Sequence, residues 1–230
     1  MLRRARSILW SATAVLIRRK TDRFLKDRLM QADAGSTVLN IGSGGSMDRI
    51  VRGCAAQRGL VVTSTDIDPL RRPDRVDDIT KSTFPDNSFD VITIMEVLEH
   101  VTNPHAAASE LKRILKPGGR LILSTPFIFP LHDRPMDFFR YTKYGLQHLF
   151  GDLDDLVIEE QNNWAEAMLI LNVRLSAERS PLAKVLGGIM LVLAYLLLPV
   201  AYLISRIIPT DFITSGYVLT GRKRGSLSGI

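Results

Sequence analysis

The sequence has a single cysteine, Cys54, among 230 residues, and it lacks a cluster of cysteine and histidine at metal-ligand spacing. An internal disulfide is therefore excluded, and no zinc site is expected. We expect a reducing, cytoplasmic setting. Aromatic residues make up only 7% of the chain, and its central part has no basic patch with interleaved aromatics. This pattern argues against a nucleic-acid partner.

The excess of positive over negative charge is confined to the N-terminal region. The formal net charge is +6, and residues 1–30 alone hold nine Lys or Arg against Asp22 and Asp27. Apolar residues recur there at helical spacing, so we predict a basic amphipathic helix over residues 1–34. Two interpretations stay open, namely a helix on an anionic membrane surface and a helix packed on the folded domain. A signal peptide is disfavoured, because the short apolar stretch runs into the basic residues 18–20 without a cleavage site.

From Thr37 onward, short apolar runs and glycine turns alternate with helical segments. This alternation predicts an α/β fold with a doubly wound, mostly parallel, seven-stranded sheet. Predicted strands cover residues 37–41, 60–66, 75–78, 89–95, 120–125, 155–161 and 216–223, and predicted helices cover 47–57, 104–115 and 143–150. We therefore expect a main domain over residues 35–162, an apolar helical insertion over 163–210, and a closing strand with a basic tail over 211–230.

The turn after the first predicted strand is rich in glycine and reads NIGSGGS over residues 40–46. Parallel α/β sheets bind ligands at the carboxyl ends of their strands, and glycine there lets a ligand approach the backbone. Asp66 ends the second predicted strand, where a carboxylate can accept hydrogen bonds from a ribose. A dinucleotide fingerprint would place a further glycine at Met47, so a nucleotide-dependent oxidoreductase is disfavoured.

Five segments occur in an order and spacing that resembles the type 11 family of class I S-adenosylmethionine (SAM)-dependent methyltransferases. They are TVLNIGSG at 37–44, TDID at 65–68, DI and FPDNSFD within 78–90, EVLEHV at 96–101 and LKPGGRL at 115–121. The resemblance covers residues 37–126. It implies a Rossmann-like methyltransferase fold over the main domain, and SAM as the cofactor.

The resemblance also implies a set of cofactor-binding residues, which are Asn40, Gly42, Ser43, Gly44, Asp66, Ile67, Asp78, Ile79 and Glu96. The glycine loop would lie along the methionine part of SAM, Asp66 would bind the ribose, and Asp78 would bind the adenine amino group. Glu96 would border the methyl-donor end. The family usually has an acid where this chain has Asn40 and glycine where it has Ser46, which bears on cofactor affinity and not on cofactor identity.

Three catalytic candidates follow from the acceptor side, namely His132, His100 and Asp137. Residues 130–142 resemble a stretch of bacterial family members associated with glycan and cell-envelope pathways. A sulfonium methyl group is already electrophilic, so the enzyme must chiefly align a nucleophile, and an alcohol also needs a base. His132 is the first candidate base, because imidazole titrates near neutral pH and acids lie beside it.

Simpler roles for these side chains stay open. His132 would then be a hydrogen-bonding loop residue, His100 a cap of the strand-to-helix turn, and Asp137 the partner of Arg140 in a helix-face ion pair. No ligand spacing singles out a metal site among His132, Asp133 and Asp137, so we expect none.

Residues 185–205 contain no charged side chain. A helix of this length extends about 31 Å, close to the hydrocarbon thickness of a bilayer. If residues 216–223 close the same sheet, however, a single crossing would leave them on the wrong side of the membrane. We therefore favour a monotopic hairpin or an in-plane helix. The alternative is a helix buried in a homo-oligomer interface.

Together these patterns predict a SAM-dependent methyltransferase, cytoplasmic and peripheral or monotopic on the inner face of the membrane. Its predicted acceptor is a hydroxyl of a small-molecule glycan, a lipid-linked sugar or another envelope precursor. The alternatives are a lipid or quinone methyltransferase, and a catalytically weak SAM-binding membrane scaffold.

Overall fold

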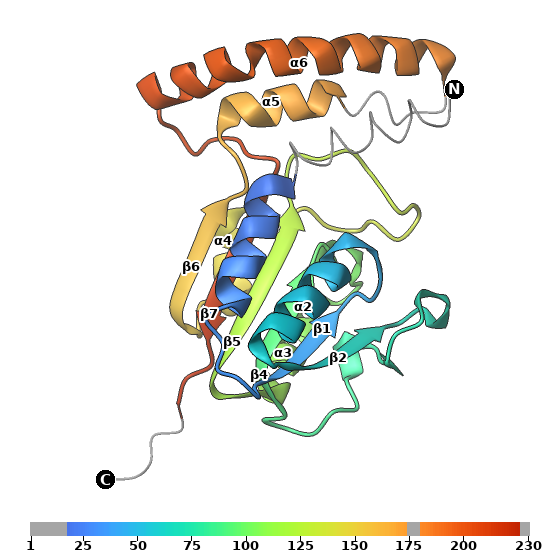
Figure 1. Ribbon diagram of the computed structural model, residues 1–230, viewed down its shortest axis with the longest axis vertical. Coiled ribbons are helices and arrows are strands. Elements are labelled where there is room, and N and C mark those ends of the chain that lie inside the picture. The colour runs from blue at the N-terminus through green and yellow to red at the C-terminus, as the bar shows by residue number, and fades with distance from the viewer. Residues whose placement is uncertain (1–17, 174–179, 226–230) are drawn as a thin grey trace. The chain divides into compact units, whose positions relative to one another are not determined.

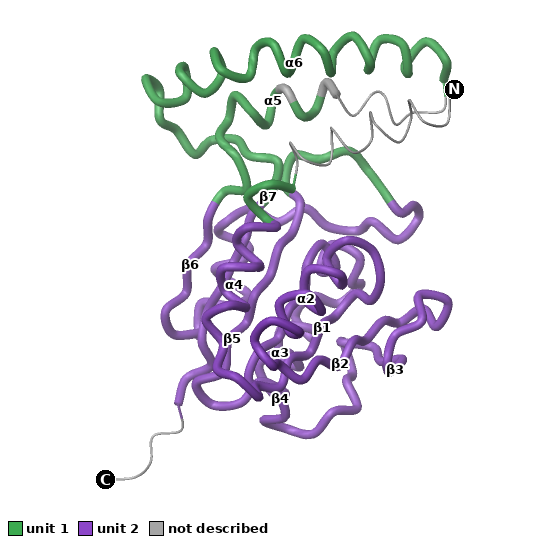
Figure 2. The backbone as a smooth tube through the Cα atoms, in the orientation of Figure 1, with its two compact units in different colours: residues 1–21, 127–132, 160–216 green, residues 22–126, 133–159, 217–230 purple. Residues whose placement is uncertain are grey.

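The computed structural model describes residues 18–173 and 180–225. The first half of the predicted amphipathic helix, residues 1–17, lies outside the described residues. The chain divides into two compact units (Figure 2). Unit 1 comprises Met1–Thr21, Phe127–His132 and Glu160–Gly216, and unit 2 comprises Asp22–Pro126, Asp133–Glu159 and Tyr217–Ile230. We describe each unit by itself.

Seven strands form one sheet in the order β3-β2-β1-β4-β5-β7-β6 (Figure 1). They are β1 (Thr37–Ile41), β2 (Val61–Asp66), β3 (Arg75–Val76), β4 (Phe89–Met95), β5 (Leu115–Pro126), β6 (Asp154–Glu160) and β7 (Gly216–Arg222). β1 pairs in parallel with β2 and β4, and β4 pairs in parallel with β5. β7 runs against β5, because Gly119 bonds to Lys223 whereas Leu121, two residues later, bonds to Thr220. The predicted mostly parallel sheet is confirmed.

Helices of unit 2 include α2 (Gly45–Arg58), α3 (Pro104–Ile114) and α4 (Lys143–Phe150), with short 3-10 turns η1 (Pro69–Arg71), η2 (Ile79–Lys81) and η3 (Leu98–His100). Capping side chains begin α3 and α4, whereas Gly44 precedes α2 without a side-chain cap. The Asn103 side chain accepts a hydrogen bond from the backbone of Ala106, and Pro104 follows at the first helical position. Thr142 caps α4 in the same way, through the backbone N–H of Gly145.

One apolar core joins the helices of unit 2 to its sheet. Leu25 and Leu29, on a helix over residues 18–29, are fully buried in a cluster with Val38 of β1 and Val51 of α2. Burying each such side chain stabilises the fold by roughly 1.5–3 kcal/mol. For residues 22–29, therefore, the interpretation as a helix packed on the domain is the one that the structure favours.

Hydrogen bonds to Asp90 hold the amino ends of β1 and β4 together. Asp90 Oδ2 accepts hydrogen bonds from the Thr37 backbone at 2.9 Å and hydroxyl at 2.7 Å, and from Lys116 Nζ at 2.8 Å. Partial burial raises the pKa of Asp90, but the hydrogen bonds from Lys116 and Thr37 outweigh it and lower that pKa to about 2. These bonds fix the register of β1 against β4. They thereby fix where the carboxyl ends of the two strands lie.

Helices α5 (Trp164–Val173) and α6 (Pro181–Ile207) of unit 1 lie side by side (Figure 1). Ser180 caps α6, and Pro181 occupies its first position. Of the described residues, α6 is the one helix long and apolar enough to cross a membrane. Its most apolar window has a mean hydropathy of 2.3, and 22% of that window is buried. The predicted apolar helical insertion before the last strand is present.

The insertion leaves and rejoins the sheet at one point. The backbone N–H of Gln161 donates to the carbonyl of Gly216 at 2.8 Å. The amide of Asn162 donates to Ser215 Oγ at 2.5 Å and accepts from the Ser215 backbone at 3.0 Å. All four residues are buried. The two ends of the insertion are therefore fastened together.

Candidate functional site

A pocket of about 310 Å³ lies in unit 2, at the carboxyl ends of β1, β2 and β4. Its wall is formed by Ile41, Gly42, Asp66, Ile67, Asp68, Arg71, Asp77, Asp78, Ile79, Glu96, Val97, His100, Val101, Asp133 and Met136. This is the edge of a parallel sheet at which α/β proteins bind ligands, and the volume suits a small molecule. Among the residues predicted from sequence, the pocket brings together Gly42, Asp66, Ile67, Asp78, Ile79, Glu96 and His100.

Gly42 supplies bare backbone to this wall. Its φ is +90°, and its N–H donates to the Thr65 carbonyl at 2.9 Å. A Cβ added here would lie 2.5 Å from Cγ2 of Val97, so no side chain fits without displacing another pocket residue. Gly44, at φ +82°, follows as the residue before α2. The glycines thus meet both needs predicted for them, an unusual backbone conformation and room for close approach.

Two acids of the wall are oriented by the loops that carry them. Asp66 Oδ1 accepts from the backbone of Asp68 at 2.9 Å, and Oδ2 lies 3.8 Å from Nε of Arg71. Asp78 Oδ1 accepts from the backbone and hydroxyl of Thr80 at 3.0 and 2.8 Å. Because one oxygen of each carboxylate is held by a backbone N–H, the acids are presented to the pocket in fixed orientations.

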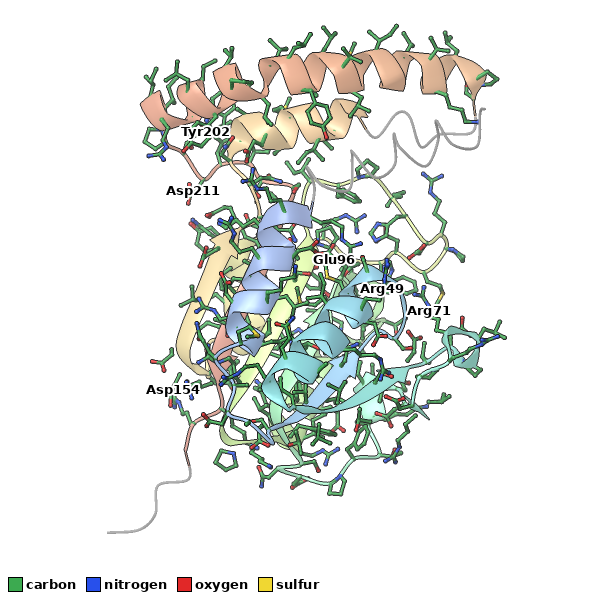
Figure 3. All side chains as sticks on the ribbon, viewed as in Figure 1. Arg49, Arg71, Glu96, Asp154, Tyr202 and Asp211 are labelled. Carbon is green, nitrogen blue, oxygen red and sulfur yellow. The ribbon has the colours of Figure 1, made fainter. Side chains whose placement is uncertain are left out.

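Glu96 follows β4 directly and has φ +56°, although it is not a glycine. Its N–H donates to the Ser124 carbonyl at 3.0 Å, which fixes this conformation. Such a conformation costs roughly 1–3 kcal/mol and concentrates at functional sites. Figure 3 labels Glu96, which follows β4, and Arg71, which ends η1. These two residues of the wall have opposite charges.

The wall is strongly acidic. Its acids are Asp66, Asp68, Asp77, Asp78, Glu96 and Asp133, and among these described lining residues Arg71 is the one Lys or Arg. A cleft lined by one sign of charge concentrates ligands of the opposite sign. SAM carries a sulfonium and an ammonium group, whereas a dinucleotide carries phosphates. The acids and the bare backbone at Gly42 therefore fit SAM and oppose the oxidoreductase alternative.

A strap over residues 133–141 is fastened to η3 beside the pocket. The backbone N–H groups of Phe138 and Phe139 donate to the Glu99 carbonyl at 3.0 and 3.2 Å, and the Tyr141 hydroxyl donates to the Leu98 carbonyl at 3.2 Å. Burial, together with the charge of Glu99, raises the pKa of Tyr141, so its hydroxyl keeps its proton. Met136, a residue of the strap, forms part of the pocket wall.

His100 is oriented by the strap. Its Nδ1 lies 2.5 Å from the Met136 carbonyl oxygen, and its Nε2 lies 3.7 Å from Oε1 of Glu99 and 4.0 Å from Oδ2 of Asp133. A carbonyl oxygen can only accept, so Nδ1 carries the proton and Nε2 is the basic nitrogen of the neutral ring. A ring in this tautomer can take a proton from a hydroxyl group.

Asp137 forms the predicted ion pair with Arg140. The guanidinium donates to both carboxylate oxygens, at 2.5 and 2.7 Å, and the Asp137 side chain is only 2% exposed. The hydrogen bonds to Asp137 are the largest cause of a raised pKa at Arg140. The pair lies on irregular chain rather than on a helix face, and neither partner belongs to the pocket wall. The catalytic role of Asp137 stays a prediction.

Three residues of the predicted cofactor set lie outside the described wall. Asn40 is 2% exposed, and its amide accepts from Thr93 Oγ1 at 2.8 Å and donates to Asp48 at 2.9 Å. The Ser43 hydroxyl donates to the Arg71 carbonyl at 3.1 Å, and Gly44 precedes α2. Their contacts are those of residues that hold the glycine loop in place, and their cofactor-binding role stays a prediction.

His132 belongs to unit 1, whereas the pocket belongs to unit 2. Within unit 1 its ring packs edge-on against Phe129, with the ring centroids 5.7 Å apart. Its role as first-choice base stays a prediction.

Comparison with known proteins agrees with this geometry. Residues 9–184, about three quarters of the chain, match the family described as "Methyltransferase domain". The chain belongs to this methyltransferase family. It is a class I enzyme with SAM as its cofactor, as the sequence motifs and the acidic pocket both predict.

Relatives of this methyltransferase include quinone enzymes. It is 36% identical over 107 residues to a ubiquinone biosynthesis O-methyltransferase of Xanthomonas oryzae, covering 40% of this chain and 44% of that protein. It is 38% identical over 104 residues to a 2-methyl-6-phytyl-1,4-hydroquinone methyltransferase of Synechocystis, covering 39% and 32%. The chain thus matches less than half the length of these curated relatives.

Solved structures share the fold of this methyltransferase. A protein from Galdieria sulphuraria that is provisionally described as a sarcosine dimethylglycine methyltransferase superposes with a TM-score of 0.61 at 15% identity. The superposition covers 89% of this chain and 85% of that one. Phosphoethanolamine N-methyltransferase 2 of Haemonchus contortus, in complex with SAM, superposes with a TM-score of 0.56 at 16% identity, covering 90% and 52%. At these identities the likeness concerns the fold alone.

Sequence reasoning missed several pocket residues. Arg71, Val97 and Met136 lie in short turns or irregular chain, where no periodic pattern marks a side chain as inward or outward. Val97 lies inside the EVLEHV motif, so its place beside Gly42 could have been suspected from that motif. Met136 carries no such signal, because its position depends on the bonds that tie the strap to η3.

Proposed function

We propose that this methyltransferase transfers a methyl group from SAM to a phenolic hydroxyl of a quinol-type acceptor with an apolar tail. The observation that carries the proposal is His100, which lines the pocket with Nε2 as its basic nitrogen. The names of two relatives, a ubiquinone O-methyltransferase and a hydroquinone methyltransferase, support this acceptor class. The glycan acceptor predicted from residues 130–142 has no such support among the relatives described above.

Acid strength also favours a phenol over a sugar. A phenol has an ordinary pKa near 10, as tyrosine shows. Sugar hydroxyls are much weaker acids, so an imidazole deprotonates them far less readily. General-base catalysis by one histidine therefore suits the phenolic acceptor better.

In the proposed reaction, different residues bind SAM, accept a proton and exclude water. SAM, when bound, supplies a methyl group on a positively charged sulfur. Asp66 and Asp78 hold the nucleoside part, and the bare backbone at Gly42 accommodates the methionine part. The ring of His100, fixed by Met136, receives the proton that the acceptor hydroxyl gives up. Val97, Val101 and Met136 add apolar surface to the wall and exclude water from the acceptor.

The acceptor class is tested with purified enzyme, SAM and two kinds of acceptor. One is a demethylated quinol with a short prenyl tail, and the other is a panel of envelope sugars, free and lipid-linked. We expect release of S-adenosylhomocysteine, measured by mass spectrometry, with the quinol alone. Release with a sugar and none with the quinol would overturn the proposal. SAM binding without turnover of either kind would favour the scaffold alternative.

A further inference from the structure

The face of α6 that points outward is entirely apolar. An α-helix turns by about 100° per residue, so residues three or four positions apart lie along one stripe. It consists of Val185, Ile189, Val192, Leu196, Val200, Leu203 and Ile207, each 50–70% exposed. All but the first turn of α6 lies beyond residue 184, where the match to the methyltransferase family ends. The stripe is therefore a feature of this chain that the shared domain does not require.

The opposite face of α6 is a seam of small and apolar residues. Gly187, Leu191, Ala194 and Ala201 are buried, at spacings of four, three and seven residues. α5 packs along α6 and buries its own Ala167. Small residues that let two backbones approach closely are typical of helix pairs in membranes. A helix with a small-residue seam inside and large aliphatic residues outside is arranged for surroundings of hydrocarbon.

Polar side chains of α6 follow one flank along its whole length. Lys184, Tyr195, Tyr202 and Arg206 fall within about 40° of one another around the axis. Arg206 donates to the Tyr202 hydroxyl at 2.6 Å and lies over that ring, 5.2 Å from its centroid. Lys184 and Arg206 lie at the two ends of α6, as they would in a spanning helix, but Tyr195 lies near its middle on the same flank. The alignment of all four side chains along one flank favours a helix lying in the plane of an interface.

The bonds at the base of the insertion argue for the same orientation. Because Asn162 and Ser215 are joined, both ends of the insertion stay on one side of any membrane. A crossing by α6 would need a second crossing by the chain before it. α5 has ten residues and a length of about 15 Å, half of what a crossing requires. Residues 174–180 would supply the remainder and contain three charged side chains, which hydrocarbon disfavours.

We propose that α6 docks in the plane of an anionic lipid bilayer, with the stripe from Val185 to Ile207 in the acyl chains. Lys184 and Arg206 lie at headgroup level, where their positive charge complements anionic lipid. α5 lies on the water side of α6. Docking of this kind does not depend on which acceptor the enzyme methylates.

The experiment is flotation of the purified full chain with vesicles of phosphatidylcholine, with or without 30% phosphatidylglycerol. We expect binding to both, stronger by at least fivefold with the anionic lipid. The double variant V192D/L203D places charge on the stripe, and its binding should fall at least tenfold. The matched control V61D alters a residue of β2 that is equally exposed, at 59%, and should bind as the original chain does. Circular dichroism and SAM affinity report whether each variant folds.

Three results would overturn the proposal. The first is an original chain that stays in solution with both kinds of vesicle. The second is a folded V192D/L203D variant that floats as well as the original. The third is a lipid-free dimer that V192D/L203D converts to monomer, because the stripe would then cover a second copy.

The orientation has its own test. A fluorophore attached to a single cysteine at position 182, 196 or 203, in a C54A background, is quenched by lipids labelled at known depths. An in-plane helix places position 196 about as deep as positions 182 and 203. A position 196 that lies much deeper than the other two would contradict the in-plane arrangement.

Discussion

The Nδ1 atom of His100 lies 2.5 Å from the carbonyl oxygen of Met136. This contact connects the EVLEHV motif to a strap residue 36 positions later, and it decides which ring nitrogen is basic. The sequence motif supplies the histidine, but the strap sets its tautomer. Of the two histidines, His100 is the one that lines the described pocket, and the role of His132 stays a prediction.

The first prediction concerns this ring. H100Q should lower kcat for a quinol acceptor roughly 10²- to 10⁴-fold, the usual contribution of a general base, and leave SAM affinity nearly unchanged. Stopped-time assays of S-adenosylhomocysteine and calorimetry with SAM measure the two effects. H105Q is the control, because His105 on α3 contacts the ring of His148 and does not line the pocket. Full activity in H100Q would remove His100 from the mechanism.

The second prediction concerns the glycine loop. G42A should weaken SAM binding at least tenfold, because the added Cβ would overlap the Val97 side chain and φ is +90°. G53A is the control, since Gly53 lies in α2 with open space around the Cβ position. That variant should be stabilised by roughly 0.5–1 kcal/mol through helix propensity. Calorimetry and urea unfolding measure both, and unchanged SAM affinity in G42A would contradict the assigned cradle.

The third prediction concerns the buried ion pair of the strap. D137N leaves the Arg140 guanidinium without its buried counter-charge, so the free energy of unfolding should fall by roughly 3 kcal/mol. The exposed pair of Lys112 and Asp152 offers a contrast, and D152N should cost less than about 1 kcal/mol. A double-mutant cycle with R140M isolates the coupling between the partners. A coupling energy near zero would show that the pair does not hold the strap.

The fourth prediction is a pH dependence of stability. Because the folded-state pKa of Asp90 is lowered to about 2, its contribution is complete above pH 4 and is lost as pH falls toward 2. K116M removes the main partner, so the midpoint of urea unfolding should vary less with pH in this window. Both side chains are more than a third exposed, which limits the effect to less than about 1 kcal/mol. An identical pH profile in K116M would assign the low pKa to another cause.

The strands were largely predictable because each is a short apolar run between turn residues. Thr37–Ile41 and Phe89–Met95 agree with the prediction residue for residue. β5 differs most from its prediction, since it begins at Leu115 and not at residue 120. Leu115 already pairs with Phe89, and the Pro-Gly-Gly turn bulges out before pairing resumes at Arg120. A local pattern marks the turn but cannot show that the strand continues across it.

The site was predictable only where a motif carries it. Gly42, Asp66 and Asp78 follow strands that the sequence shows, and the structure brings them to one pocket. The surroundings of Asn40 were not predictable, because its partner Thr93 lies 53 residues away on a neighbouring strand. Side chains contributed by loops depend on tertiary contacts in the same way.

The bonds between Asn162 and Ser215 hold the two ends of the insertion next to each other. A segment whose two ends already meet can be exchanged for a short hairpin turn, and β6 and β7 would still stand next to each other. We therefore expect that residues 163–213 can be replaced by a short turn while the sheet and the pocket of unit 2 keep their structure.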